Sequence, residues 1–356
     1  MRFEFILKSL NLLNVCYLPV MNYFTNKHLS FLVLALLLGL TFTPHLFAKS
    51  IQEVVNIDGI QIHTAKWTDD NGPRNKPTVV LLSGPTNSWN SDSAWFARLA
   101  PKLAKTHRVI AIDRAGQVLN TSNAAVGYQK FSQQLDKIIQ YYQLKDIQII
   151  AFASSNLTLN HYLTRHKDAP VKSVILIDPD VLLPYSMSRY KNDVTVFKKN
   201  LPEYLSYIAA GKYDQRAKEK NAIEMKLLKQ LSTDDNDIDW DYVDFIFKNR
   251  LLINNLQNLF KEIADYDLDL DSAYTIGFPS RIPLTIIDTN FEQDYINKSK
   301  KPEVRKGLRL WREEAKKYYQ SLTSQSVKGK YIALQTQEHL VPFSDPNLLI
   351  KLIIEE

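Results

Sequence analysis

The sequence predicts an α/β fold in which helices cover both faces of a doubly wound, mostly parallel sheet, with a helical cap inserted late in the chain. Short apolar runs at 78–82, 108–113 and 147–152 are typical of strands that are buried on both faces. The segments between them carry apolar residues at steps of three and four, which is the spacing of amphipathic helices. Strands that alternate with helices in this way pair in parallel through right-handed crossovers.

The folded part of the chain is expected to begin with a hairpin. Two segments of alternating apolar and polar residues, 51–57 and 60–67, flank Asp58 and Gly59, a pair that favours a two-residue turn. The further elements expected are, in chain order, a strand at 78–82, a helix around Trp95, Phe96, Leu99 and Leu103, a strand at 108–113, a helix at 131–142, a strand at 147–152 leading into a helix, a strand within 171–180, a strand at 281–288, a charged helix at about 303–321, a strand at 328–336 and a closing amphipathic helix.

The alternation of strands and helices stops between residues 181 and 280. This interval is helical in pattern and rich in aromatic residues, namely Tyr185, Tyr190, Phe197, Tyr204, Tyr207, Trp240, Tyr242, Phe245, Phe247 and Phe260. An insertion at this point of a parallel sheet predicts a cap over the carboxyl ends of the strands, where α/β proteins bind ligands. We therefore expect a core at 49–180 and 281–356 and a cap at 181–280.

Residues 1–48 have the features of a leader. The apolar run at 29–43 is too short to span a bilayer comfortably, and it is followed by the small residue Ala48. We expect a secretory signal peptide cleaved after Ala48, a second initiator at Met21, a secreted or periplasmic protein, and no integral membrane segment after cleavage. The alternative, an uncleaved anchor, is disfavoured because Pro44 and His45 end the run early.

Composition excludes several classes of function. The chain has 356 residues, 45% of them hydrophobic and 23% charged, and its net charge of +6 is spread among interspersed acids and bases. This pattern is typical of solvated helix faces rather than of a nucleic-acid-binding stripe. The single cysteine, Cys16, lies in the leader, and no CxxC, HExxH or phosphate-loop pattern occurs, so we expect no metal and no cofactor.

The segment Ala151-Phe152-Ala153-Ser154-Ser155 joins the strand at 147–152 to the following helix. A sharp strand-to-helix turn brings backbone against backbone, so the residues two before and two after its tip must be small. Only a tip at Ala153 meets this condition, because a tip at Ser154 would place Phe152 and Asn156 there and a tip at Ser155 would place Leu157 there. We interpret Ser154 and Ser155 as caps of the helix, with nucleophilic use of Ser154 as the alternative.

This segment resembles the nucleophile elbow of the α/β-hydrolase superfamily, whose pattern is Gly-x-Ser-x-Gly, with Ala153 at the nucleophile position. Three further segments extend the resemblance over residues 51–356: VVLLSGPTNSW at 79–89, VIAIDRAGQVLNTS at 109–122, with the Asp-Arg-Ala-Gly loop of one branch, and QEHLVPFSDPNLLIKLI at 337–353. The resemblance implies the α/β-hydrolase fold with a cap and an ancestral hydrolysis of esters or amides.

The resemblance also implies the site. His339 matches the general base. The acid is left open between Asp178 and Asp180, before the cap, and Asp288, Glu292 and Asp294, after it. Gly84, Pro85 and Thr86 match the oxyanion loop, but Pro85 has no N–H to donate.

Three hypotheses follow. The first is a pseudoenzyme, an exported protein that lost the serine nucleophile and binds a small, partly apolar ligand under its cap. The second is a serine hydrolase of an ester or amide that uses Ser154, His339 and an acid such as Asp178. The third is an interaction module. The other histidines, His63, His107, His161 and His166, fit strand or helix surfaces and receive no role.

Overall fold

The computed structural model describes residues 48–68, 76–86, 88–119, 121–122, 124–232 and 237–354. These residues belong to one compact unit. The expected leader, apart from Ala48, lies outside the described residues.

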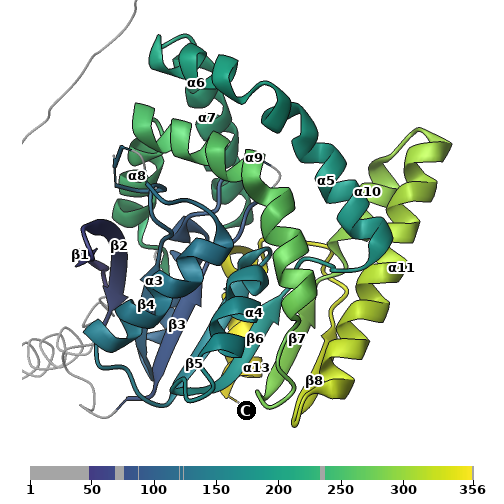
Figure 1. The fold of residues 1–356 in the computed structure, drawn as a ribbon. Helices are drawn as coiled ribbons and strands as arrows, with labels where there is room; N and C mark the ends of the chain where they lie inside the picture. The colour runs from purple at the N-terminus through teal and green to yellow at the C-terminus, as the bar shows by residue number, and fades with distance from the viewer. Residues whose placement is uncertain are drawn as a thin grey trace, which may run out of the picture. The chain divides into compact units, whose positions relative to one another are not determined.

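The described residues form one eight-stranded sheet with the strand order β1-β2-β4-β3-β5-β6-β7-β8 (Figure 1). The strands are β1 (Ile51–Ile57), β2 (Ile60–Trp67), β3 (Thr78–Leu82), β4 (Arg108–Ile112), β5 (Ile147–Phe152), β6 (Val171–Ile177), β7 (Leu284–Asp288) and β8 (Gly329–Ala333). Strand β2 is antiparallel to β1 and β4, and the remaining neighbours are parallel. The predicted doubly wound, mostly parallel sheet is confirmed.

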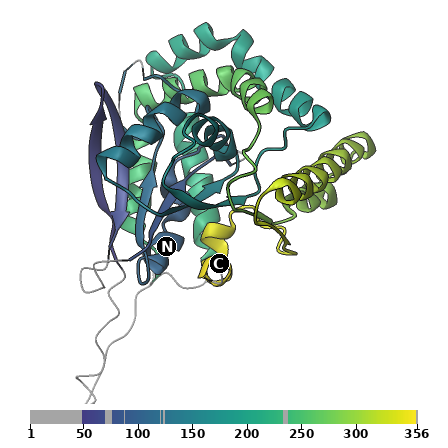
Figure 2. The same cartoon turned by 60° about the horizontal axis from the view of Figure 1, so that its bottom comes forward.

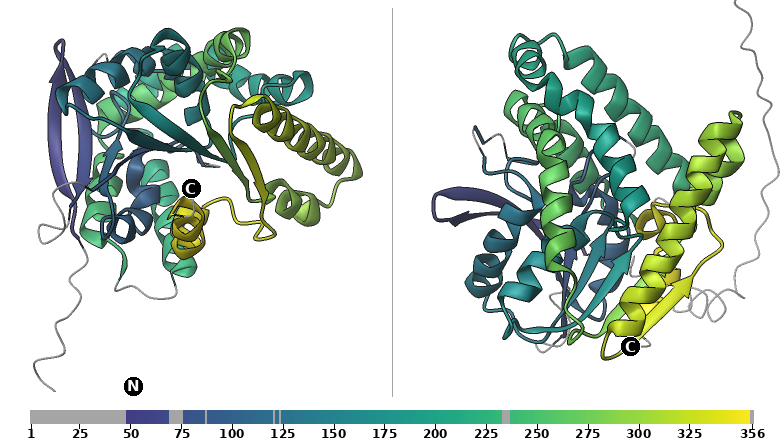
Figure 3. Two further views of the ribbon diagram at one scale, coloured as in Figure 1. Left: turned by 90° about the horizontal axis from the view of Figure 1, so that it is seen from below. Right: turned by 45° about the vertical axis from the view of Figure 1, so that its right-hand side comes forward.

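The first two strands form the expected hairpin at one edge of the sheet. Asp58 and Gly59 both have positive φ angles, 53° and 83°, as a two-residue turn with the twist of its strands requires. In Figure 3 this hairpin lies at the side opposite to the long helix α11 (Pro302–Gln325), which packs beside β8.

Helices cover both faces of the sheet. One face packs against α3 (Tyr128–Tyr141), α4 (Ser155–Arg165) and α11, and the other against the 3-10 helix η1 (Ser93–Phe96), α2 (Leu99–Leu103), α12 (Val341–Ser344) and α13 (Pro346–Ile354) (Figure 2). Side chains alternate along β3 accordingly, since Val80 and Leu82 belong to the first core cluster and Val79 and Leu81 to the second. A strand buried on both faces explains the continuous apolar runs of the sequence.

Among the described residues, five helices lie between β6 and β7, above the carboxyl ends of the strands (Figure 1). They are α5 (Pro184–Lys199), α6 (Leu201–Ala209), α7 (Asp214–Leu231), α8 (Trp240–Asn249) and α9 (Ile253–Ile276). Helix α9 contacts α5 and α6 and also reaches α3 and α4 of the core. The cap is therefore packed directly on the elements that carry the elbow.

Two local features differ from the sequence expectation. The single helix expected around Trp95 is divided into η1 and α2. A helix that was not expected, α10 (Phe291–Lys298), follows β7 directly. The sequence features that favour this helix are the acidic residues Glu292 and Asp294 in its first turn and the helical spacing of Phe291, Tyr295 and Ile296. A segment of eight residues is too short for this periodicity to predict a helix from the sequence.

A buried ion network ties the cap to the core. Arg250, at the end of α8, donates from Nε and Nη2 to the two carboxylate oxygens of Asp92 at 2.5 and 2.8 Å, and from Nη1 to Oε2 of Glu224 at 2.7 Å. All three residues are buried. Because an uncompensated buried charge is costly, each member of this network depends on the others.

We expect Arg250→Met to lower the free energy of unfolding by about 3–5 kcal/mol, since it leaves Asp92 and Glu224 buried without their cation. Urea denaturation followed by circular dichroism measures this change. Lys198→Met is the matched control, because Lys198 forms an exposed cap ion pair with Asp267 and should contribute less than about 1 kcal/mol. Equal losses in the two variants would contradict the assignment of the Arg250 network as the anchor of the cap.

Candidate active site

Ala153 forms the turn between β5 and α4. Its φ angle is 47°, in the left-handed region that costs a non-glycine residue about 1–2 kcal/mol. Its backbone N–H donates to the carbonyl of Ile177 on β6 at 2.9 Å. The small residues Ala151 and Ser155, two positions away on each side, are buried. The structure thus places residue 153, rather than Ser154, at the tip.

The loop after β3 approaches this turn closely. A Cβ atom added to Gly84 would lie 2.4 Å from the carbonyl oxygen of Phe152 and 2.6 Å from the backbone nitrogen of Ser154. Only glycine fits this contact. The next residue, Pro85, has no N–H, and the N–H of Thr86 donates to the carbonyl of Asn90 at 3.1 Å. The oxyanion loop that the resemblance implies therefore provides no free N–H at Pro85 or Thr86.

His339 and Asp178 lie together. His339, in the loop between β8 and α12, contacts Oδ2 of Asp178 through Nδ1 at 2.8 Å. The imidazole ring packs between the rings of Phe152 and Phe291, with centroid distances of 4.6 and 4.2 Å. A carboxylate on Nδ1 fixes the tautomer that carries its proton there and leaves Nε2 as an acceptor. This is the orientation that a general base needs.

Asp178 follows β6 directly and is fixed from both sides. Its φ angle is 46°, and its carboxylate accepts from the backbone N–H of Thr289 at 2.7 Å and from Oγ1 of Thr289 at 2.6 Å. Burial raises the pKa of Asp178, and the hydrogen bond from His339 opposes that rise.

The other candidate acids have different partners. Asp288, at the end of β7, accepts two bonds from Nη1 of Arg312, at 2.7 and 2.8 Å, and one from Tyr331 at 2.5 Å. Asp294 pairs with Lys298 at 2.7 Å. Among the alternatives left open by the sequence, Asp178 is the one that contacts His339.

Ser154 is not a helix cap of the expected kind. It is the first residue before α4, but its side chain makes no capping hydrogen bond. Its hydroxyl lies 2.8 Å from that of Tyr266 on α9, which in turn donates to Asp180. The prediction that the Ser154 side chain caps α4 is therefore wrong. Its Oγ forms a hydrogen bond with the Tyr266 hydroxyl of α9 instead of accepting one from a backbone N–H of α4.

A cavity of about 420 Å³ lies over these groups, between the core and the cap. The residues predicted from the sequence that line it are Pro85, Thr86, Ala153, Ser154, Asp178, Asp180, Glu292 and His339. Gly84 lies beneath the elbow contact and Asp294 lines a neighbouring cavity.

Seven aromatic side chains also line the cavity, namely Trp89, Tyr190, Tyr266, Phe291, Tyr295, Trp311 and Tyr319. Of the cap aromatics named from the sequence, only Tyr190 is among them. Others, such as Phe197, Tyr204 and Phe260, pack against one another inside the cap. Trp311 and Tyr319 come from α11, which resembles an ordinary charged helix in the sequence, so only tertiary packing identifies them.

Glu292, on α10, is buried at the cavity wall. Burial, together with the nearby charge of Asp178, raises its pKa to about 8, and Arg312 opposes the rise. The contact with Arg312 is long, 3.5 Å between Nη1 of Arg312 and Oε2 of Glu292. Glu292 is therefore largely protonated at neutral pH.

A second cavity of about 450 Å³ adjoins the first. It shares Thr86, Phe291, Tyr295 and His339 with the first and adds the exposed apolar residues Ile223 and Leu227 of α7. His339 thus lies in the wall common to both cavities.

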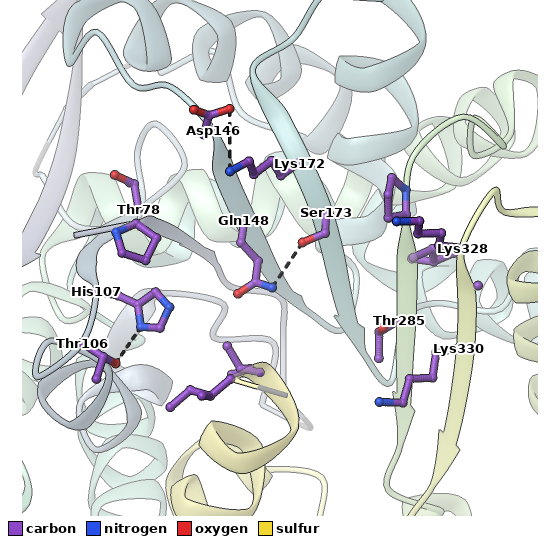
Figure 4. Close-up of a pocket in the computed structure, with 16 residues that line it drawn as sticks. Thr78, Thr106, His107, Asp146, Gln148, Lys172, Ser173, Thr285, Lys328 and Lys330 are labelled. Atoms are coloured by element: carbon purple, nitrogen blue, oxygen red, sulfur yellow. Dashed lines mark hydrogen bonds and ion pairs between the residues drawn. The ribbon is translucent and has the colours of Figure 1, made fainter. Parts of the chain in front are cut away.

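A larger hollow of about 890 Å³ lies at the opposite ends of the strands (Figure 4). Thr78, Gln148 and Thr285 line it near the starts of β3, β5 and β7, and Gln148 donates to Ser173 at 3.2 Å. Ala153 and His339 are not among its residues. In parallel α/β sheets ligands bind at the carboxyl ends, so we assign the candidate site to the cavity at Ala153.

Two histidines expected on surfaces are buried instead. His63, on β2, contacts Oδ2 of Asp113 through Nδ1 at 2.7 Å. His161, on α4, is also a buried residue. Strand and helix periodicity does not reveal which residues the cap and the loops will cover.

Within the part of the chain that the structure describes, no group of three metal-ligating side chains occurs. No helix of that part combines the length and the apolar character needed to cross a bilayer.

No protein-family model matches this sequence, and no curated protein matches it. Solved structures do resemble it. The structure of Cfl2 from Burkholderia cenocepacia has a TM-score of 0.56 and 17% identity and covers 88% of this chain and 97% of its own.

Two further structures give similar agreement. An α/β-hydrolase-fold protein from Burkholderia ambifaria has a TM-score of 0.56 and 15% identity, covering 87% of this chain and 100% of its own. The enol-lactonase from Burkholderia xenovorans LB400 has a TM-score of 0.52 and 12% identity, covering 85% and 98%. Together with the strand order and the turn at Ala153, these similarities identify the fold of this chain as the α/β-hydrolase fold.

Proposed function

We propose that this protein binds a small, partly apolar molecule in the cavity beneath its cap and does not hydrolyse it by the serine mechanism. The observation that carries the proposal is Ala153 at the strained tip of the elbow. A methyl group occupies the position from which a nucleophilic oxygen would attack, and it cannot form the covalent intermediate.

The second deficiency is in the oxyanion hole. Pro85 cannot donate, and the N–H of Thr86 is engaged with Asn90. Loss of one such donor alone lowers acyl-transfer rates by about 10²–10³-fold. Two independent losses at one transition state favour a role other than acyl transfer.

The rest of the site supports binding. The cavity of about 420 Å³ is within the range of small-molecule pockets, and aromatic walls combine there with a few converging polar groups. The His339–Asp178 contact keeps an oriented imidazole available to a ligand. An aromatic cavity between core and cap favours ligand binding over a pure interaction module.

The alternative is hydrolysis through Ser154. Structures with this fold include an epoxide hydrolase and an enol-lactonase, so the fold itself is compatible with hydrolysis. Against this alternative, Ser154 has a helical φ angle of −61°, and its hydroxyl contacts Tyr266.

We further propose, from the leader sequence alone, that the protein is exported to the periplasm or the medium.

The purified chain from residue 49 should not be labelled by a fluorophosphonate and should not turn over p-nitrophenyl esters above background, because residue 153 carries no hydroxyl and the hydroxyl of Ser154 contacts Tyr266. Gel fluorescence and absorbance assays measure both. Ser154→Ala is the control. Stoichiometric labelling that this variant abolishes would establish the Ser154 hydrolase instead.

Ala153→Ser should restore only weak esterase activity, since Pro85 still withholds an N–H from the oxyanion. Adding Pro85→Gly should raise kcat/KM further, by up to about 10²–10³-fold, and the two changes should be more than additive because they act on one transition state. The fourth member of the series, Pro85→Gly alone, should remain inactive. Full rates from Ala153→Ser alone would show that Pro85 is not at the oxyanion position.

The raised pKa of Glu292 should make the free energy of unfolding fall as the pH rises. The folded state keeps its proton up to about pH 8, whereas the unfolded state loses it near the ordinary value of 4.5, so stability from this group falls between those two values. We expect Glu292→Gln to gain stability relative to the native protein by up to about 1.4 kcal/mol per pH unit from pH 5 to pH 8.

Urea denaturation at several pH values measures this difference. Glu313→Gln, on the exposed side of α11, is the control and should give a constant difference. A Glu292→Gln difference that does not grow with pH would show that Glu292 ionises normally in the folded state.

A further inference from the structure

We propose that the cavity at Ala153 selects a small organic cation, a quaternary or protonated amine, through aromatic walls and two carboxyl groups, the half-buried Asp180 and the buried Glu292. This inference rests on the proposed binding function and names the chemical class of the ligand.

The aromatic wall is centred on Trp311. Its ring stacks with that of Tyr295 at 6.3 Å and 10°, and it meets Phe291 edge-on at 5.4 Å and 82° and Tyr190 at 6.1 Å and 85°. The indole N–H donates to the hydroxyl of Tyr190 at 2.9 Å, which fixes both rings. Aromatic faces carry negative partial charge and attract a cation within about 6 Å.

One cation already lies against this wall. The guanidinium carbon of Arg189 is 5.0 Å from the centroid of the Trp311 ring. Arg189 is half-buried, and its charge acts on Asp193 at the same wall. Partial desolvation of the Asp193 carboxyl raises its pKa, and Arg189 opposes that rise. The positive charge of Arg189 therefore offsets the negative charge of Asp193. A protonated His339 offsets the negative charge of Asp178 in the same way.

Two carboxyl groups of the cavity remain without an adequate counter-charge. Asp180 accepts a hydrogen bond from Tyr266, a neutral donor. Glu292 reaches Arg312 only at 3.5 Å, and the same Nη1 of Arg312 is bound to Asp288 at 2.7 and 2.8 Å.

Burial raises the pKa of both groups, for Glu292 to about 8. An ionised carboxylate that is removed from water is unfavourable unless a cation accompanies it. A cationic ligand would supply that charge while its alkyl groups contact the rings. A neutral ligand would leave the protonation of these carboxyls unchanged, whereas a cation would favour their ionised form and an anion would disfavour it.

Isothermal titration calorimetry with choline and with 3,3-dimethylbutan-1-ol tests the inference. The two molecules have the same shape and differ in one atom, a quaternary nitrogen in choline and a carbon in the alcohol. We expect the full mature chain to bind choline with a Kd at least about tenfold lower than that of the alcohol, since the cation–π and carboxylate interactions act only on choline.

Three cavity variants locate the effect. Asp180→Asn and Glu292→Gln should each raise the Kd of choline about fivefold or more, and Trp311→Leu should do likewise, with little change for the alcohol. Asp294→Asn is the matched control, because Asp294 is on the same helix as Glu292 but pairs with Lys298 and lines the neighbouring cavity. Circular dichroism and the Tm establish that each variant is folded.

Each outcome is decisive. Preference for choline that the cavity variants remove and Asp294→Asn preserves supports the inference. Equal binding of the two probes, or loss of choline binding in Asp294→Asn alone, overturns it while leaving a binding cavity in place. Binding of neither probe also overturns the cation inference, whereas the proposed lack of serine hydrolysis fails only if fluorophosphonate labelling or ester turnover is observed.

Discussion

The site depends on backbone-to-backbone packing at the elbow. Gly84 lies so close to Phe152 and Ser154 that no side chain fits between them, and Ala153 adopts a left-handed turn in the same contact. This packing positions the loop after β3, the start of α4 and the end of β5 at one point of the sheet. It is independent of the side chain at the tip, which explains how the elbow geometry coexists with a methyl group where the fold commonly places a nucleophile.

The acids around the elbow have separate roles because their partners differ. Asp178 orients His339, whereas Asp288 joins β7 to α11 through Arg312 and β8 through Tyr331. Asp178 follows β6 directly and Asp288 is the last residue of β7, so the parallel topology brings both to the same edge of the sheet. What distinguishes them is the basic or aromatic side chain that a later element contributes, not their position in the sheet.

The cap determines the character of the cavity. Helix α9 packs on α3 and α4 and contributes Tyr266, whose hydroxyl bonds to both Ser154 and Asp180. The buried ion pair of Arg250 with Asp92 joins α8 to the core, and that with Glu224 joins α8 to α7 of the cap. The cap partly covers carboxyl groups that would be solvated in an open sheet, and their raised pKa values are the electrostatic consequence.

The sequence by itself determined the order of the strands, the hairpin at Asp58-Gly59 and the tip of the elbow at Ala153. These follow from local periodicity, turn chemistry and the small size of Ala151 and Ser155. Only the tertiary structure decided that Asp178 contacts His339, that Ser154 bonds to Tyr266, and that Trp311 of a charged helix lines the cavity. Such contacts join residues more than a hundred positions apart, and their choice depends on how the cap and α11 pack, which the spacing of residues along one element cannot specify.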